Sequence, residues 1–117
     1  MTRDTVLFVD DEEHLRIAAG QTFDLAEVNF HLMDKAEAAL TLIEDGFDGI
    51  LVTDIRMPGM DGVALMQRAL QIDPDLPVIL ITGHGDVELA VTCIKAGAYD
   101  FLEKPCEPAR LVACVKR

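Results

Sequence analysis

Short runs rich in apolar residues alternate with longer amphipathic stretches along the whole chain. Four runs cover residues 5–9, 49–53, 77–81 and 99–103, and those at 49–53 and 77–81 are almost entirely apolar. A fifth run, 28–33, alternates instead, with Val28, Phe30 and Leu32 separated by other residues. Continuous apolar runs are typical of strands buried on both faces, whereas alternation suits a sheet edge. The pattern predicts five strands, with the second at an edge.

Apolar residues at helical spacing fill the stretches between the predicted strands. The helices are expected to start near residue 12, to cover 35–45, to run from Asp61 to Ile72, to follow Asp86 as far as Gly97, and to open at Glu107-Pro108. Asp61 and Asp86 are suitable N-cap residues, and Gly46 and Gly97 are suitable C-caps. Strands that alternate with helices predict an α/β domain with a parallel sheet.

Composition narrows the classes to which the protein can belong. The 117 residues carry 21 acidic and 10 basic side chains, for a formal net charge of −11, and half are hydrophobic. One domain with a real core is expected at this length. The excess of acid argues against direct nucleic-acid binding and against adhesion to an anionic membrane.

Cysteine usage and the chain ends add expectations about location. The three cysteines, Cys93, Cys106 and Cys114, show no metal-binding spacing, so reduced thiols are expected. No signal peptide precedes the first strand and no apolar run is long enough to span a bilayer, which favours a cytoplasmic location. The sequence stops within the fifth predicted helix, so we expect the N-terminal fragment of a longer protein.

Polar residues suited to a metal and a phosphoryl group follow four of the predicted strands. Asp10 and Asp11 follow the first, Asp54 the third, Thr82 the fourth and Lys104 the fifth. The C-terminal ends of parallel strands form one crevice, where ligands bind. Mg²⁺ prefers oxygen ligands, an aspartate can form an aspartyl-phosphate, and lysine is a compact charge for phosphoryl oxygens. The spacing predicts one site for Mg²⁺ and a phosphoryl group.

Each of these residues also has an ordinary structural interpretation. A lone aspartate after a strand is usually a turn or cap residue, and Lys104 alone would be part of an ordinary loop. Such residues at four strand ends together favour the functional interpretation. His14 and His31 are expected at the surface, and His84 is expected to be a polar loop residue.

The stretch from Asp54 to Gly62, DIRMPGMDG, resembles the loop after the phosphoacceptor in receiver domains of bacterial two-component response regulators. The run 10–13, Thr82 and Lys104-Pro105 fall where that family has its acidic pair, hydroxyl and lysine-proline. The resemblance covers essentially the whole chain. It implies a flavodoxin-like, doubly wound fold with five parallel strands in the order 2-1-3-4-5 and five helices. It also implies phosphorylation by a sensor histidine kinase, and a signalling role rather than that of an enzyme.

The resemblance assigns the metal and the phosphoacceptor to particular residues. It implies that Asp54 accepts the phosphoryl group. Asp11, Asp54 and the backbone carbonyl of Arg56 are implied as Mg²⁺ ligands, with Asp10 helping through water.

Further residues are implied to bind the phosphoryl group and to relay its arrival. Thr82 and Lys104 would contact the group, and the Lys104–Pro105 peptide bond would be cis. Phe101 falls on the aromatic switch position of the family. Arg56 and His84 lie two residues after Asp54 and Thr82, so they are expected to tune the phosphoryl lifetime.

A finer resemblance lies in residues 82–91 and 97–105, which are similar to regulators of the nitrogen-regulation and dicarboxylate-transport type. In those proteins the receiver precedes an AAA+ ATPase that activates sigma-54 polymerase, and a helix-turn-helix DNA-binding domain. A homodimer through the fourth helix, fifth strand and fifth helix is expected as the readout of phosphorylation. Two local departures occur: 25–27 lacks the glycine common before the second strand, and Gly20 interrupts the first helix.

Two rival functions belong to other classes. A haloacid-dehalogenase-like phosphatase also uses aspartate and Mg²⁺, but it needs an Asp-x-Asp arrangement after the first strand, which 10–12 does not supply, and a substrate cap for which this chain has no room. A receiver-like interaction module that is never phosphorylated has no need of the acidic pair, the phosphoacceptor, the threonine and the lysine, which are all present. A phosphorylation-controlled switch is therefore the predicted function.

Overall fold

The computed structural model describes residues 4–83 and 85–116. Its strands form one parallel five-stranded sheet in the order 2-1-3-4-5, as the family resemblance implies. The strands are β1 (Thr5–Val9), β2 (Asn29–Met33), β3 (Ile50–Asp54), β4 (Val78–Thr82) and β5 (Asp100–Glu103). Their C-terminal ends lie along one edge of the sheet, which becomes the edge of the site.

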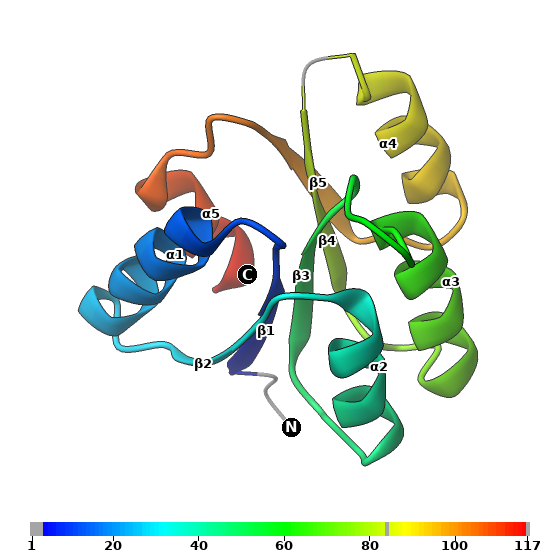
Figure 1. Ribbon diagram of the computed structural model, residues 1–117, viewed down its shortest axis with the longest axis horizontal. Helices are drawn as coiled ribbons and strands as arrows, with labels where there is room; N and C mark the ends of the chain where they lie inside the picture. Colours follow the sequence, from blue (N-terminus) through cyan, green and yellow to red (C-terminus); the bar gives the residue numbers. More distant parts are fainter. Residues whose placement is uncertain (1–3, 84, 117) are drawn as a thin grey trace.

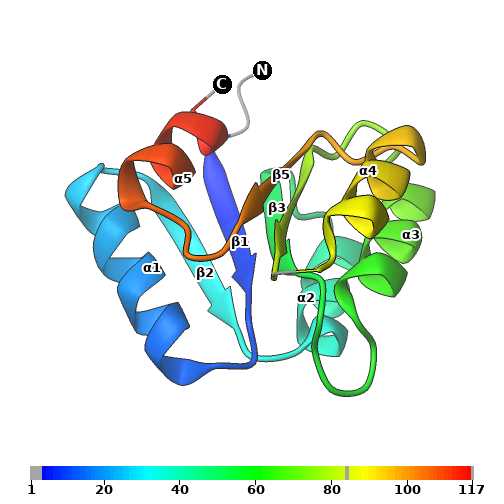
Figure 2. The same ribbon diagram turned by 90° about the horizontal axis from the view of Figure 1, so that it is seen from above.

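Helices cover both faces of the sheet (Figures 1 and 2). They are α1 (Glu13–Leu25), α2 (Ala36–Glu44), α3 (Gly62–Ile72), α4 (Val87–Lys95) and α5 (Pro108–Val115). Helices α1 and α5 pack on one face, and α2, α3 and α4 pack on the other, which makes the doubly wound arrangement visible in Figure 2. In the described ranges, no helix combines the length and apolar character needed to cross a membrane.

Alternate residues of each central strand enter two separate cores. Val6, Phe8 and Val52 belong to the core beneath α1 and α5, whereas Leu7 and Leu51 belong to the core beneath α2, α3 and α4. Strands β3 and β4 are buried along their full length, as the continuous apolar runs predict. Strand β2 alternates exposed and half-buried residues, which confirms it as an edge strand. The buried centre of the sheet thus carries Asp54 and Thr82, the last residues of β3 and β4.

Three helices end in the same local conformation, although only two of them use glycine for it. The amide after the left-handed residue donates five residues back in each case: Phe47 to Leu42 after α2, Ala98 to Cys93 after α4, and Val28 to Phe23 after α1. The left-handed residues are Gly46 (φ 100°), Gly97 (φ 124°) and Glu27 (φ 58°). Glu27 lies within 25–27, where the chain lacks the glycine common in the family. The chain therefore places a side chain in the left-handed conformation, which glycine adopts at lower cost.

Of the two predicted N-caps, one is correct and the other is wrong. Asp61 lies at the N-cap of α3, where its carboxylate accepts a 2.9 Å hydrogen bond from the Ala64 amide. Asp86 occupies the N-cap position of α4, but its carboxylate makes no bond to the helix. It binds Arg56 instead, which a local cap rule does not consider.

Candidate functional site

The ends of β1 and β3 bring three carboxylates together. Side-chain oxygens of Asp10, Asp11 and Asp54 lie within 4.8 Å of one another. Asp10 and Asp54 are buried, with 1% and 3% of their surfaces exposed, whereas Asp11 faces solvent. Carboxylates this close repel one another, and a divalent cation that binds oxygen relieves that repulsion. The donor set therefore fits a hard cation such as Mg²⁺ that keeps water on its open side.

Three hydrogen bonds hold the loop between β1 and α1. The Asp10 amide donates to the Met33 carbonyl at 3.1 Å, which extends the pairing of β1 with β2. The Asp10 carboxylate accepts from the Glu12 amide at 3.0 Å, and the Asp10 carbonyl accepts from Arg16 Nη1 at 2.8 Å. Arg16 is absent from the sequence-derived site. Its position one helical turn beyond Glu12 is the only signal that it could reach back to this loop.

The pKa of Asp10 reflects its position in this loop. Burial is the main cause that raises it, and the neighbouring charges of Asp54 and Asp11 add to the rise. The Glu12 amide and the Lys104 ammonium act in the opposite direction, but they do not reverse the shift. The site thus holds a carboxylate whose charged form a bound cation would favour.

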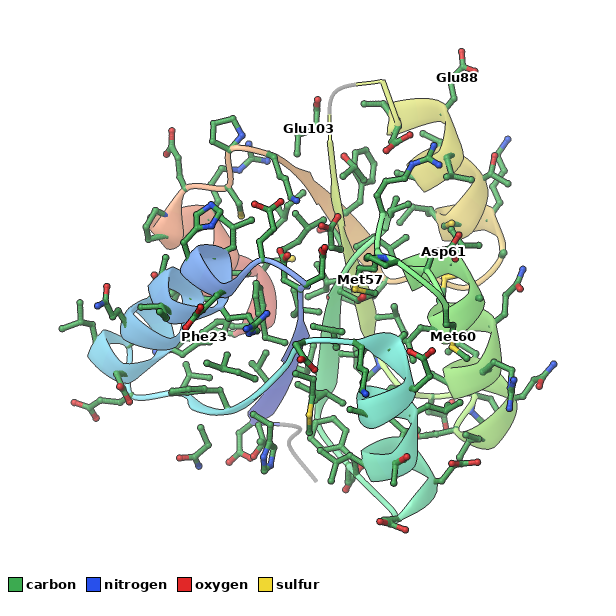
Figure 3. All side chains as sticks on the ribbon, in the orientation of Figure 1. Phe23, Met57, Met60, Asp61, Glu88 and Glu103 are labelled. Atoms are coloured by element: carbon green, nitrogen blue, oxygen red, sulfur yellow. The ribbon has the colours of Figure 1, made fainter. Side chains whose placement is uncertain are left out.

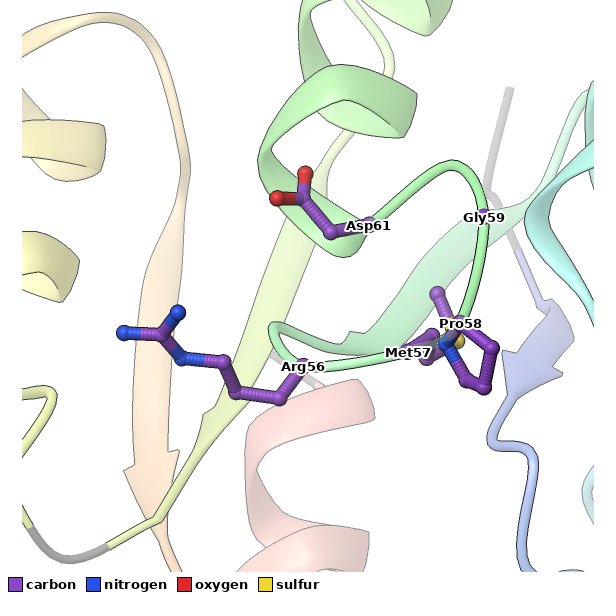
Figure 4. A pocket seen from close by; sticks show the side chains of 5 residues that line it. All are labelled: Arg56, Met57, Pro58, Gly59 and Asp61. Atoms are coloured by element: carbon purple, nitrogen blue, oxygen red, sulfur yellow. The ribbon is translucent and has the colours of Figure 1, made fainter.

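The loop from β3 to α3 fixes Asp54 in place. The Ile55 amide donates to the Ile81 carbonyl at 3.1 Å, and the Gly62 amide donates to the Ile55 carbonyl at 2.9 Å. Ile55 and Met57 are buried and anchor the loop in the core beneath α2, α3 and α4. A Cβ atom on Gly62 would collide with the backbone of Asp54, so this close approach requires glycine. The outer side of the loop is a shallow hollow, from which the Arg56 side chain extends away from Pro58 (Figure 4).

Lys104 reaches into the cluster from the end of β5. Its Nζ lies 2.8 Å from Asp54 Oδ2, and its amide donates to the Thr82 carbonyl at 2.8 Å. Burial alone would lower the pKa of Lys104, but the hydrogen bond and the charge of Asp54 offset burial and raise it. The peptide bond from Lys104 to Pro105 is cis. Lys104 is therefore a charged donor that the loop aims at Asp54.

Thr82 ends β4 with a hydroxyl that has no hydrogen-bond partner in the described part of the chain. The residue is completely buried, and its Oγ is the one buried side-chain oxygen or nitrogen left unpaired there. Phe101, on β5, is half-buried and packs against the core beneath α2, α3 and α4. An unpaired buried hydroxyl carries a desolvation cost, so it is a group prepared to bind an incoming acceptor.

Arg56 and His84 are the two residues expected to tune the phosphoryl lifetime. The Arg56 side chain does not join the carboxylate cluster, because its guanidinium binds Asp86 at the start of α4. The Arg56 backbone does border the site, because its amide lies 3.4 Å from Asp54 Oδ1. His84 lies outside the described residues, and its role stays a prediction.

A cavity of about 510 Å³ opens beside the cluster, between α1 and the loop that leads into α5. Its lining is mostly apolar and includes Leu15, Ala18 and Pro108, while Asp10 and Lys104 lie at its polar end. A molecule that fills this cavity would therefore lie next to Asp10 and Lys104.

The chain is similar in sequence to known proteins. The sequence pattern of the family described as response regulator receiver domain matches residues 6–116. The chain is 48% identical to the C4-dicarboxylate transport transcriptional regulatory protein DctD of Rhizobium meliloti, over 97% of this chain and 25% of that protein. It is 36% identical to the DNA-binding transcriptional regulator NtrC of Escherichia coli, over 100% of this chain and 25% of that protein.

A solved structure has the same fold. The receiver domain of NtrX from Brucella abortus is 36% identical and superposes with a TM-score of 0.90, over 96% of this chain and 95% of that one. The chain spans about a quarter of the length of DctD and of NtrC, 25% in each case.

Proposed function

We propose that this chain, which belongs to the response regulator receiver domain family, takes a phosphoryl group from a sensor histidine kinase onto Asp54. The observation that carries the proposal is the placement of Asp54. It is buried at the end of the central strand, beside two further carboxylates and 2.8 Å from the Lys104 ammonium. That set supplies a nucleophile, oxygen ligands for a cation and a positive charge for phosphoryl oxygens.

Mg²⁺ is the proposed cofactor of this reaction. Asp11, Asp54 and the backbone carbonyl of Arg56 would hold it, and Asp10 would contribute through water. The crowding of the three carboxylates supports this assignment, since it creates a strongly negative pocket with one solvent-facing member. When bound, the ion would neutralise charge on the phosphoryl oxygens.

In the proposed transfer a carboxylate oxygen of Asp54 attacks the phosphorus of a phosphohistidine. An oxygen–phosphorus bond forms while the phosphorus–nitrogen bond breaks, and the imidazole leaves with the electron pair and takes up a proton. In dephosphorylation water attacks the phosphorus, the aspartyl oxygen–phosphorus bond breaks, and inorganic phosphate leaves. Lys104 and the Thr82 hydroxyl would bind the phosphoryl oxygens, so both would change partners when the group arrives.

The proposed output lies on the α4–β5–α5 face. Drawing the Thr82 hydroxyl toward the phosphoryl group would open space into which Phe101 rotates, and this would bias α4. Val87, Val91 and Tyr99 are large apolar residues exposed on α4 and just before β5. They would form the centre of a homodimer in the phosphorylated state. AAA+ and DNA-binding domains of a sigma-54-dependent activator are the proposed recipients, since a receiver with a net charge of −11 is ill-suited to bind DNA itself.

Intact mass spectrometry with a small phosphodonor and Mg²⁺ tests the phosphoacceptor. The wild type should gain one phosphoryl group and Asp54→Asn should gain none. Asp61→Asn is the matched control, because asparagine keeps the α3 cap while the same charge is removed nearby. Equal labelling of the wild type and Asp54→Asn would overturn the assignment. A wild type that takes up no phosphoryl group would point to the unphosphorylated interaction module.

A further inference from the structure

A bidentate ion pair ties the phosphorylation loop to the start of α4. Arg56 Nη2 lies 2.8 Å from Asp86 Oδ1, and Arg56 Nε lies 3.1 Å from Asp86 Oδ2. Two parallel bonds between a guanidinium and a carboxylate form the strongest common ion-pair geometry. The hydrogen bonds from Arg56 lower the pKa of Asp86, which keeps the carboxylate charged. The pair spans thirty residues of sequence and joins two of the loops that border the site.

The same ion pair leaves α4 without a side-chain cap. Asp61 and Asp86 occupy equivalent N-cap positions of α3 and α4. Asp61 has the extended backbone of a capping residue, with ψ at 177°, and accepts from an amide of its own helix. Asp86 has ψ at 11°, and its carboxylate makes no bond to α4. Because free amides at a helix start favour a carboxylate, Asp86 has two competing partners: Arg56 and α4.

Arg56 also has two competing partners once Asp54 is phosphorylated. Its amide already lies 3.4 Å from Asp54 Oδ1, so the residue borders the phosphorylation site. The guanidinium is solvent-accessible, with 69% of the Arg56 side chain exposed against 13% for Asp86. A phosphoryl group adds roughly one to two negative charges with acceptor oxygens that suit a guanidinium fork. The Arg56 side chain can therefore leave Asp86 without disturbing the packing of the core.

We propose that Asp86 is a positioning residue that holds the Arg56 guanidinium away from the phosphorylation site, and that the two residues exchange partners when Asp54 is phosphorylated. Arg56 then binds phosphoryl oxygens, and Asp86 turns to cap the first turn of α4. This rests on the proposed function of Asp54 and adds a second route to α4 beside Thr82. It also explains how Arg56 would affect the phosphoryl lifetime. Asp86 holds its side chain away from the site until Asp54 is phosphorylated.

Three variants test the exchange by NMR of the amides at 87–90. Asp86→Asn keeps capping ability but loses the charge that binds Arg56, and Arg56→Met frees Asp86. Each should move the amides in the direction that beryllofluoride with Mg²⁺ moves them in the wild type. Each should also slow hydrogen exchange of the Leu89 amide by about fivefold, which is the effect of one cap. The double variant should show no further change.

Two exposed residues provide matched controls. Glu88→Gln removes one negative charge from the same turn, where the side chain projects outward (Figure 3). Arg68→Met removes an exposed arginine from α3. Both should retain the wild-type amide positions. The Arg56 Nε–H signal, identified by its loss in Arg56→Met, should shift when the wild type binds beryllofluoride.

Other outcomes would overturn the exchange. An unmoved Arg56 signal in the beryllofluoride-bound wild type would show that the guanidinium stays with Asp86. Opposite or additive effects of Arg56→Met and Asp86→Asn would show that they do not act through one ion pair. Intact mass of the wild type with a phosphodonor is measured in parallel. A wild type that stays unphosphorylated there refutes the proposed function of Asp54, whereas the amide positions of the unphosphorylated variants still decide whether the ion pair restrains α4.

Discussion

Replacing the buried hydroxyl of Thr82 with a methyl group should stabilise the unphosphorylated protein and abolish its response to phosphorylation. Thr82 is completely buried, and its Oγ has no partner among residues 4–83 and 85–116. An unsatisfied buried hydroxyl costs roughly 1–3 kcal/mol. Valine has the same branching and suits a strand. Thr82→Val should therefore raise the free energy of unfolding by about 1 kcal/mol, at the low end of that range.

Thr53 is a matched comparison in the neighbouring strand. It is also completely buried, but its hydroxyl donates to the Asp54 carbonyl at 3.0 Å. Thr53→Val should therefore lower stability by about 1 kcal/mol, which is the usual value of one net hydrogen bond. With about 2.1 cal/mol/K of unfolding entropy per residue, the two changes should move Tm by about 4 °C in opposite directions. Urea unfolding and calorimetry without Mg²⁺ measure both.

Substitutions of Thr82 should also change how the protein responds to beryllofluoride. Thr82→Val should lose the beryllofluoride-induced change at α4, because it has no hydroxyl to follow the phosphoryl group. Thr82→Ser should keep that change although it leaves a small cavity and loses stability. If Thr82→Val proves as destabilising as Thr53→Val, the hydroxyl is hydrogen-bonded in the resting protein. The reasoning from an unpaired group would then be wrong.

Three further changes test other parts of the structure. Asp11→Ala should remove the Mg²⁺-dependent rise in Tm but keep or increase metal-free stability, because one repelling charge is lost; a wild type that does not respond to Mg²⁺ would contradict the metal site. Arg16→Ala should weaken Mg²⁺ binding roughly tenfold, since the Asp10 carbonyl loses its outer support, and Arg16→Lys should recover part of it; equal Mg²⁺ titrations would contradict this. Glu27→Gly should raise stability by up to about 1 kcal/mol in urea unfolding, because glycine adopts the left-handed conformation more readily; a loss of stability would show that the side chain contributes there.

The strand ends were the most predictable part of this protein. Asp54 and Lys104 lie fifty residues apart in sequence, yet the parallel-sheet rule places them together and the structure joins them at 2.8 Å. The rule works because Asp54 ends β3 and Lys104 directly follows β5, and burial sets the positions of these strands in the sheet. The order 2-1-3-4-5 came from the family resemblance, since apolar runs alone do not say which strands are neighbours.

Side chains that leave the strand ends were less predictable. Asp86 satisfies every local rule for a cap, but its carboxylate turns to an arginine that lies thirty residues earlier. Arg16 is one more arginine on a helix until the loop of Asp10 folds against it. In both cases a long, flexible guanidinium chooses a partner by tertiary geometry, and sequence spacing carries no record of that choice.

These contacts suggest why one added charge can act on two elements at once. Asp54 holds Lys104 directly, and the loop that begins at Asp54 holds Asp86 through Arg56. A phosphoryl group on Asp54 would compete for both cations, so the loops before α5 and α4 would each lose a resting contact. Thr82 directly precedes the loop into α4, and its unpaired hydroxyl would gain a partner in the same step. The resting state is thus held by ion pairs that the phosphoryl group can replace. The difference in affinity of Lys104 and Arg56 for carboxylate and phosphoryl oxygens sets how far the equilibrium between the two conformations moves.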